Sequence, residues 1–172
     1  MASMVDRMVR AAKLDPHLYE EVEADKTALG QALGVVVLAS IAGGVGSGGL
    51  GGLSGFFIGT AAALIGWFVW AALTYFIGTR ILPEPNTQAD LGELLRTIGF
   101  ASSPGLLRVL GLIPGVTGIV FLISGIWMLA AMIIAVRQAL DYRSTLRAVG
   151  VCVIGWIVQI VVMLLLMPFI RS

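Results

Sequence analysis

The sequence contains only one cysteine, Cys152, and one histidine, His17, among its 172 residues. A single cysteine cannot form a disulfide within the chain, and the usual metal sites need clusters of these two residue types. A nucleophile activated by a histidine base would depend on His17 alone, which lies among charged residues near the N-terminus. We therefore expect no metal site, no cofactor and no enzymatic activity.

Charged residues are also scarce, at 12% of the chain, and the formal net charge is only +1. Soluble domains are typically about 25% charged. A net charge so close to zero provides no field that would attract nucleic acid, so we expect no nucleic-acid partner. Hydrophobic residues make up 58% of the chain, and the mean hydropathy is +0.97. One water-soluble fold of this length cannot bury that much apolar surface, which indicates an integral membrane protein.

Long uncharged stretches divide the chain into membrane spans. No charge occurs from 27 to 79, a stretch longer than the roughly 20 residues that one helical crossing needs. The glycine-rich segment 46–55 favours a turn inside it, because glycine weakens helices. Charges are absent again over 109–136 and 148–170. These stretches predict spans near 27–45, 56–78, 116–136 and 148–169.

The segment 91–113 is a less regular candidate for a fifth span. Its apolar residues recur at helical spacing, but it also contains Glu93, Arg96 and Arg108. Pro104 predicts a helix that is broken or kinked there, since proline lacks the N–H that a helix interior requires. We predict that 91–113 is the third of five transmembrane helices, with a re-entrant segment as the alternative.

The distribution of basic residues favours five spans over four. With five spans and a cytoplasmic N-terminus, nine of the eleven basic residues fall in cytoplasmic segments: Arg7, Arg10, Lys13, Lys26, Arg80, Arg96, Arg137, Arg143 and Arg147. Cytoplasmic segments of membrane proteins show this excess. Four spans would move the cluster at 137–147 outside and largely remove the asymmetry. The predicted fold is therefore an all-α polytopic membrane helical bundle with its C-terminus outside.

Residues 1–26 form a charged cytoplasmic leader ahead of the five-helix transmembrane domain of 27–172. Its first part predicts a short amphipathic helix that lies on the membrane or on a partner, or stays solvated. Asp15 followed by Pro16 predicts the start of a second helix. We expect that second helix to run continuously into the first span.

Glycines spaced four residues apart are candidates for close helix packing. In lipid, such pairs let helix backbones approach one another closely. They predict contacts within the chain, with a second copy, or with other membrane proteins. The pairs are Gly30 and Gly34, Gly55 and Gly59, and Gly111 and Gly115.

Charged and polar residues of the third predicted span are candidates for contact with a ligand or a lipid. Charges at membrane depth are costly and often functional, and broken helices often line cavities. The alternative is that the arginines only anchor the ends of the span by reaching toward the headgroups. The candidate residues are Arg96, Ser102, Ser103, Pro104 and Arg108.

Several of these residues also carry a family resemblance. Phe100-Ala101-Ser102-Ser103-Pro104 in the third span, Trp127 in the fourth and Arg147-Ala148 at the start of the fifth occur in this order. The chain thereby resembles the Yip family of Rab-interacting five-span membrane proteins, and its prokaryotic branch in particular. This resemblance implies five helices, a cytoplasmic N-terminus and a cell inner membrane location. The chain lacks the Asp-Leu-Tyr-Gly-Pro-type motif of eukaryotic members, so Rab binding is not carried over.

Two functional hypotheses follow from the sequence. The first is a non-enzymatic membrane scaffold or accessory protein of the Yip type, which acts through helix packing with itself or with other membrane proteins. The second is a small transporter or lipid-handling protein that uses the broken third helix. An intramembrane enzyme is a distant third. The expected partners are membrane lipids and other membrane proteins.

Overall fold

A computed structural model describes the backbone of residues 2–48 and 52–170, and their side chains except those of Leu53 and 162–170. Every regular element within these ranges is helical. The elements are α1 (Met4–Ala12), α2 (Pro16–Ala24), the 3-10 helix η1 (Lys26–Ala28), α3 (Leu29–Gly46), α4 (Gly52–Phe76), the π-helical turn η2 (Ile77–Ile81), α5 (Leu91–Ala101), the 3-10 helix η3 (Ser103–Leu112), α6 (Thr117–Ala139) and α7 (Thr145–Ile170). The structure therefore confirms the predicted all-α fold class.

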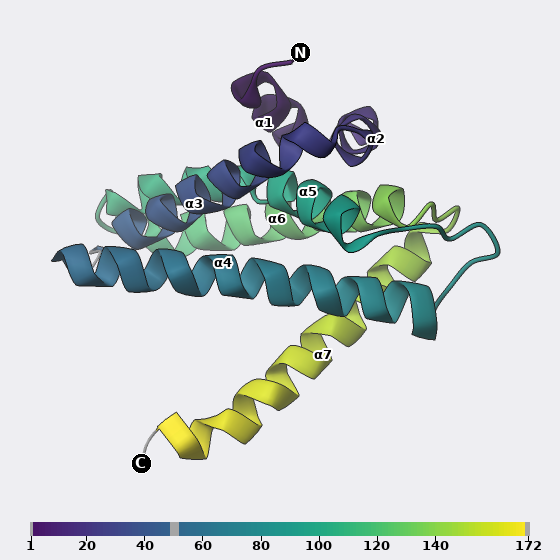
Figure 1. The fold of residues 1–172 in the computed structure, drawn as a ribbon. Coiled ribbons are helices and arrows are strands. Elements are labelled where there is room, and N and C mark those ends of the chain that lie inside the picture. The colour runs from purple at the N-terminus through teal and green to yellow at the C-terminus, as the bar shows by residue number, and fades with distance from the viewer. Residues whose placement is uncertain (1, 49–51, 171–172) are drawn as a thin grey trace.

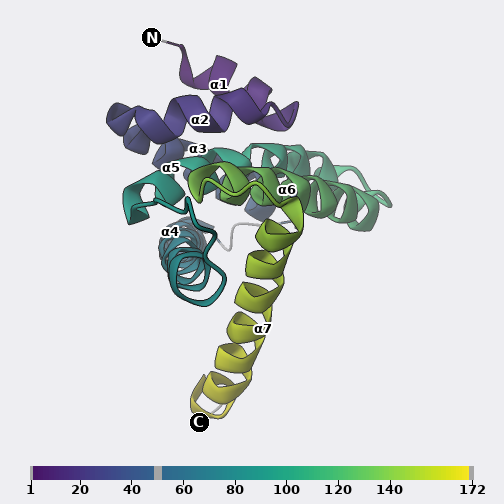
Figure 2. The same cartoon turned by 90° about the vertical axis from the view of Figure 1, so that its right-hand side faces the viewer.

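The helices form three layers (Figures 1 and 2). The central layer consists of α3, α5 with η3, and α6, and η3 packs against both α3 and α6. The leader helices α1 and α2 cover one face of this layer, while α4 and α7 lie on the other (Figure 2). Helix α7 starts beside α6 and then runs away from the other helices, so its far end stands apart (Figure 1).

Three helical stretches of the described chain are long and apolar enough to cross a membrane: Lys26–Gly46, Ser54–Ile81 and Thr117–Ala139. They overlap the predicted spans 27–45, 56–78 and 116–136. The stretch Thr145–Val161 is apolar but shorter, within the part of the chain searched. The segment between the first two spans is shorter than the predicted turn 46–55, because α4 already begins at Gly52. Residues 49–51 of that turn lie outside the described residues, and so does Arg171 near the C-terminus.

The segment 91–113 forms two helical pieces in tandem. Asp90 caps α5 by accepting from the Glu93 N–H at 2.8 Å, and the Glu93 carboxylate accepts from the Asp90 N–H at 2.7 Å. This reciprocal cap satisfies two N–H groups that a helix start leaves unpaired. Helix α5 ends at Ala101, and the chain continues as the 3-10 helix η3 with Pro104 in its first turn.

The second leader helix does not run into α3 as the sequence predicted. Helix α2 ends at Ala24, and Asp25 adopts an extended conformation with φ −86° and ψ 91°. Its carboxylate accepts from the Thr27 N–H at 3.0 Å and starts η1. The prediction of one continuous helix was wrong because a side chain that caps the following turn also ends the helix before it.

Backbone contact between α3 and the α5–η3 segment depends on glycines. A Cβ atom at Gly46 would overlap the carbonyl group of Arg108, and one at Gly111 would lie 2.6 Å from the Gly46 oxygen. A Cβ at Gly99 would lie 2.7 Å from the Cβ of Ala32. These helices therefore approach more closely than any residue with a side chain would allow at these positions.

Hydrogen bonds join the loop 82–90, which follows η2, to the loop 140–144, which precedes α7. The Tyr142 hydroxyl lies 2.8 Å from the Gly78 carbonyl oxygen and 2.7 Å from that of Leu82, where α4 and η2 end. Glu84 accepts from the N–H of Arg143 at 3.0 Å, just before α7. Burial, together with the nearby Glu84, raises the pKa of Tyr142 to about 12, so it stays a neutral donor.

Candidate functional site

An interhelical cavity of about 640 Å³ lies between the central layer and helices α4 and α7. This volume is in the range of small-molecule sites, which are mostly apolar with a few polar groups. Aromatic and methionine side chains form much of the wall: Trp67, Trp70, Phe121, Met128, Met132 and Trp156. The polar side chains among the described lining residues are Ser40, Ser102, Arg108 and Gln159. None of the described lining residues is acidic.

Arg108 provides the only formal charge among the described lining residues of this cavity. Its Nε–H donates to the Ser124 hydroxyl at 3.3 Å, and its Cζ lies 5.5 Å from the centre of the Phe121 ring. The Arg108 side chain also runs beside α3, 3.7 Å from where a Cβ at Gly43 would be. No described acidic group lies within ion-pair distance of it. The cavity therefore holds a partly buried cation that has no counter-charge among the described residues.

Two tryptophans on α4 line the cavity in different ways. The Trp67 Nε1–H donates to the Leu95 carbonyl at 3.1 Å and thereby ties α4 to α5. The Nε1–H of Trp70 is buried and has no acceptor among the described residues. Trp70 also packs beside Gly155 of α7, where a Cβ would lie 3.2 Å from its ring. A buried donor without an acceptor is uncommon in folded proteins and marks a position where a ligand or water could bind.

The rim of the cavity is exposed and apolar. Leu122 is 64% exposed, Ile126 62% and Trp156 51%. Leu122 and Ile126 belong to α6 and Trp156 belongs to α7, and α7 runs away from α6 (Figure 2). Exposed apolar side chains of two helices therefore border the cavity.

The five predicted contact residues divide into two groups. Ser102 and Arg108 both line the cavity. The Ser103 hydroxyl instead donates to the Phe100 carbonyl at 2.6 Å, and Pro104 is buried within the first turn of η3. Arg96 points away from the cavity toward the leader. The structure thus brings together Ser102 and Arg108, but not the other three.

Arg96 binds the end of α2. It is only 5% exposed, its Nε–H donates to the Val22 carbonyl at 2.8 Å, and an Nη2–H donates to the Glu23 carbonyl. Carbonyl groups at the end of a helix lack partners within that helix and favour a nearby positive charge. Arg96 therefore fastens the leader to α5.

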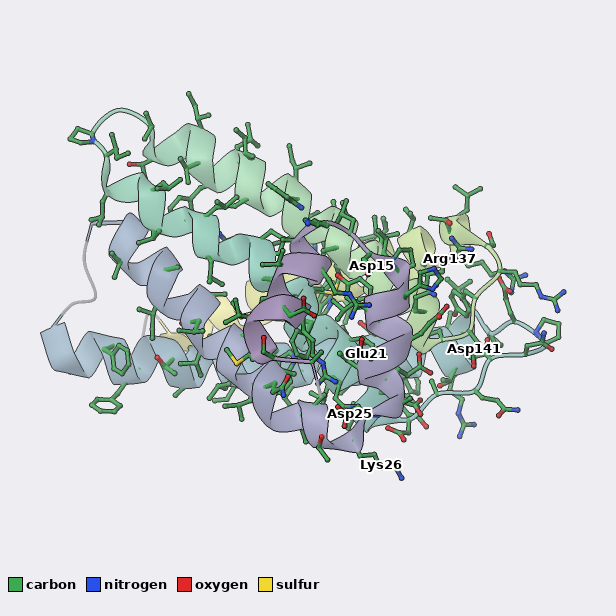
Figure 3. The ribbon with its side chains drawn as sticks, turned by 90° about the horizontal axis from the view of Figure 1, so that it is seen from above. Asp15, Glu21, Asp25, Lys26, Arg137 and Asp141 are labelled. Atoms are coloured by element: carbon green, nitrogen blue, oxygen red, sulfur yellow. The ribbon has the colours of Figure 1, made fainter. Side chains whose placement is uncertain are left out.

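A second arginine cluster holds the two leader helices together. Arg7 of α1 is only 3% exposed. Its guanidinium Nη2 lies 2.9 Å from a carboxylate oxygen of Glu21 and 2.7 Å from one of Asp25. Its Nη1–H donates to the side-chain oxygen of Gln31 at 3.1 Å. Glu21 lies on the side of α2 that faces α1, and Asp25 directly follows the end of α2 (Figure 3). Hydrogen bonds from Thr27 and then Arg7 lower the pKa of Asp25 to about 2. The sequence placed Arg7 on a polar face but gave no signal of these partners.

The surroundings of the leader carboxylate Glu23 oppose its charge. It lies beside Asp141 and Glu93, with Glu20 also near, and only Arg96 counteracts them. Burial, followed by the charges of Asp141 and Glu93, raises the pKa of Glu23 from 4.5 to about 7.

The docking of the leader is therefore expected to weaken as the pH rises. Below pH 4.5 Glu23 is protonated whether the leader is docked or released. Between pH 4.5 and about 7 it stays protonated in the docked leader but loses its proton in the released leader. Each rise in pH within this range therefore favours the released leader. Spin labels at Val9 and Leu122 should report more released leader at about pH 8.5 than at about pH 5.5, with this difference reduced in Glu23→Gln. An equal pH dependence in the variant would contradict this role for Glu23.

The predicted packing glycines occupy different environments. Gly34 faces the Met4 sulfur, 3.4 Å from where its Cβ would be, and Gly111 contacts the backbone of Gly46. Gly30 and Gly59 have open space on their Cβ side. Gly115 also has open space there and occupies a turn with φ +85°, a backbone conformation that favours glycine. Gly55 lines a small crevice of about 210 Å³ between α3 and α4, together with Gly59.

The described residues contain no group of three or more histidine, cysteine, aspartate or glutamate side chains placed to hold a metal ion. Cys152 is buried in α7.

Comparison with known proteins identifies the family. The sequence matches the Yip1 domain over residues 16–167, which confirms the resemblance seen in the third, fourth and fifth predicted spans. Neither the curated proteins nor the solved structures include a match to the chain. The matched region contains the second leader helix, the central layer and the cavity. The chain therefore belongs to the Yip1 domain family and is an integral membrane protein.

Proposed function

We propose that this protein is a non-enzymatic membrane protein that holds an amphiphile from the surrounding bilayer in its interhelical cavity. The observation that carries this proposal is a cavity with aromatic and methionine walls, an unpaired Arg108 and an apolar rim. Its shape and chemistry suit a molecule with one polar end and an apolar chain. This proposal develops the lipid-handling alternative from the sequence, and the chemistry of the cavity supports it.

The proposal includes the five-span arrangement, which would place the cavity at membrane depth. Helix α5 and η3 together contain 21 residues, and at the rise of each helix type they extend about 36 Å, enough to cross a hydrocarbon core of about 30 Å. The loops 82–90 and 140–144 lie at one end of the bundle (Figure 1). Arg80, Arg143 and Arg147 lie in or within a few residues of these loops along the chain. An excess of basic residues favours a cytoplasmic location for that end, with the leader on the same side and the C-terminus outside.

A scaffold or accessory role is the second candidate. It is favoured by the exposed apolar surface of α4, where Gly59 has open space on its Cβ side. Small residues on an exposed face let another membrane helix approach closely. The partner would be a second copy or another membrane protein.

Gentle extraction followed by native mass spectrometry separates the two candidates. We expect one lipid-sized molecule to stay bound to each chain and to be lost in Gly66→Trp, which fills the cavity from α4. Gly118→Trp is the matched control, because Gly118 also has open space but does not line the cavity. A chain without bound lipid that retains a protein partner at fixed stoichiometry would contradict the lipid proposal and support the scaffold.

A further inference from the structure

We propose that the cavity selects a phospholipid with a net negative headgroup, with the phosphate at Arg108 and one acyl chain along the wall of tryptophans and methionines. This inference rests on the proposed function and adds the chemical class of the ligand. It is carried by the charge of the cavity, the free donors of Arg108 and the length of the apolar wall.

The charge of the lining is one-sided. Arg108 is the only ionised group among the described lining residues, and the other polar groups are neutral. An ion removed from water is costly unless an opposite charge meets it. A ligand with one net negative charge would neutralise the cavity, whereas a zwitterionic headgroup would bring an ammonium for which the described lining offers no carboxylate.

The guanidinium of Arg108 is arranged for an anionic oxygen. Only its Nε–H donates to a described acceptor, Ser124, so the donors on both terminal nitrogens remain available. The Ser124 hydroxyl donates to the Phe121 carbonyl at 3.2 Å, which fixes its oxygen as the acceptor for Arg108. An arginine held in this way can present two parallel N–H groups to a phosphate.

The remainder of the cavity suits an acyl chain. The lining residues of α6 extend from Phe121 to Met132, a rise of about 16 Å. Met128 and Met132 have flexible side chains that adapt to an irregular apolar ligand. Arg108 lies at the Phe121 end of this wall, beside Phe121 and Ser124. A bound lipid would therefore have its head at that end and its chain directed toward Met132.

Lipids with brominated acyl chains test the selection directly, because bromine quenches nearby tryptophan fluorescence. Trp67, Trp70 and Trp156 line the cavity. The full-length protein in detergent would be titrated with brominated phosphatidylglycerol, phosphatidylcholine and a brominated fatty acid. We expect phosphatidylglycerol to quench at roughly tenfold lower concentration than phosphatidylcholine, because the choline ammonium would meet no carboxylate among the described lining residues.

Variants assign the preference to Arg108. In Arg108→Gln the two phospholipids should bind within about twofold of one another, while Arg108→Lys keeps part of the preference. Arg80→Gln is the control, because Arg80 is exposed and lies outside the cavity lining. The comparison of lipids on the unaltered protein does not depend on whether a variant folds.

Each other outcome overturns a defined part of the inference. Equal quenching by phosphatidylglycerol and phosphatidylcholine would refute the selection for negative charge but leave the proposed lipid cavity intact. Tighter binding of phosphatidylcholine would indicate that the tryptophans hold a choline group. Tighter binding of the fatty acid would refute a phospholipid as the ligand. Absence of saturable quenching by every lipid would refute the proposed function as well.

Discussion

Replacing Gly46 with alanine is expected to lower the apparent melting temperature of the purified protein by roughly 10 °C, from a loss of about 3 kcal/mol in stability. The new Cβ would overlap the backbone carbonyl of Arg108. A carbonyl group in a 3-10 helix cannot rotate away as a side chain would, so α3 and η3 must separate. Gly111 also contacts the Gly46 carbonyl, which makes the whole crossing sensitive to this change.

Gly30→Ala is a control in the same helix, and it is not expected to lower the melting temperature. A Cβ at Gly30 meets nothing within 4 Å. Alanine is favoured over glycine in a helix by about 0.5–1 kcal/mol, so Gly30→Ala should leave the melting temperature unchanged or raise it slightly. If both variants behaved alike, the close approach of α3 and η3 would not be present in the folded protein.

Replacing Arg96 with methionine is expected to release the leader from the bundle. The variant loses two hydrogen bonds from a charged group to the carbonyls of Val22 and Glu23, each worth about 1.5–3 kcal/mol. A total loss of about 3 kcal/mol raises the released population roughly a hundredfold. Hydrogen–deuterium exchange should therefore accelerate across α1 and α2 while α6 remains protected.

Arg80→Met is the matched control for this experiment. Arg80 is exposed near the end of α4, so its replacement should leave exchange in the leader unchanged. Arg96→Lys should give an intermediate result, since lysine keeps the charge but not the fork of donors. Unchanged exchange in the leader of Arg96→Met would refute the role of Arg96 as the fastener of α2.

The sequence located the three long apolar helices of the described chain because hydropathy averages over many residues. Uncharged stretches and their flanking charges placed the first, second and fourth spans within a few residues of α3, α4 and α6. Helix ends were less accurate where a single side chain decides them. Asp25 ends α2 by capping η1, and α4 begins at Gly52 although glycine disfavours helix.

The third predicted span shows what hydropathy does not report. The 3-10 geometry of η3 extends over ten residues, longer than most such helices. A sequence pattern at helical spacing distinguishes the two helix types poorly, because both bury one side. The glycine contacts at Gly46 and Gly99 were likewise not among the predicted pairs, since their partners come from a different helix and share no spacing with them.

The arginines illustrate the same limit for the candidate site. Arg96 and Arg108 were grouped because both lie in the third predicted span. They point to different places, since Arg96 binds a helix 74 residues earlier in the chain while Arg108 faces the cavity. Only the tertiary arrangement distinguishes a charge that fastens helices from one that remains free for a ligand.

A structure of the protein determined in a bilayer containing phosphatidylglycerol would test the proposed lipid cavity most directly. We expect an elongated density between α4, α6 and α7 that ends at the Arg108 guanidinium, with the leader docked over the opposite face of the central layer. A bundle in which α7 closes against α4 and α6, fills this space with side chains and leaves Arg108 paired with protein would contradict it.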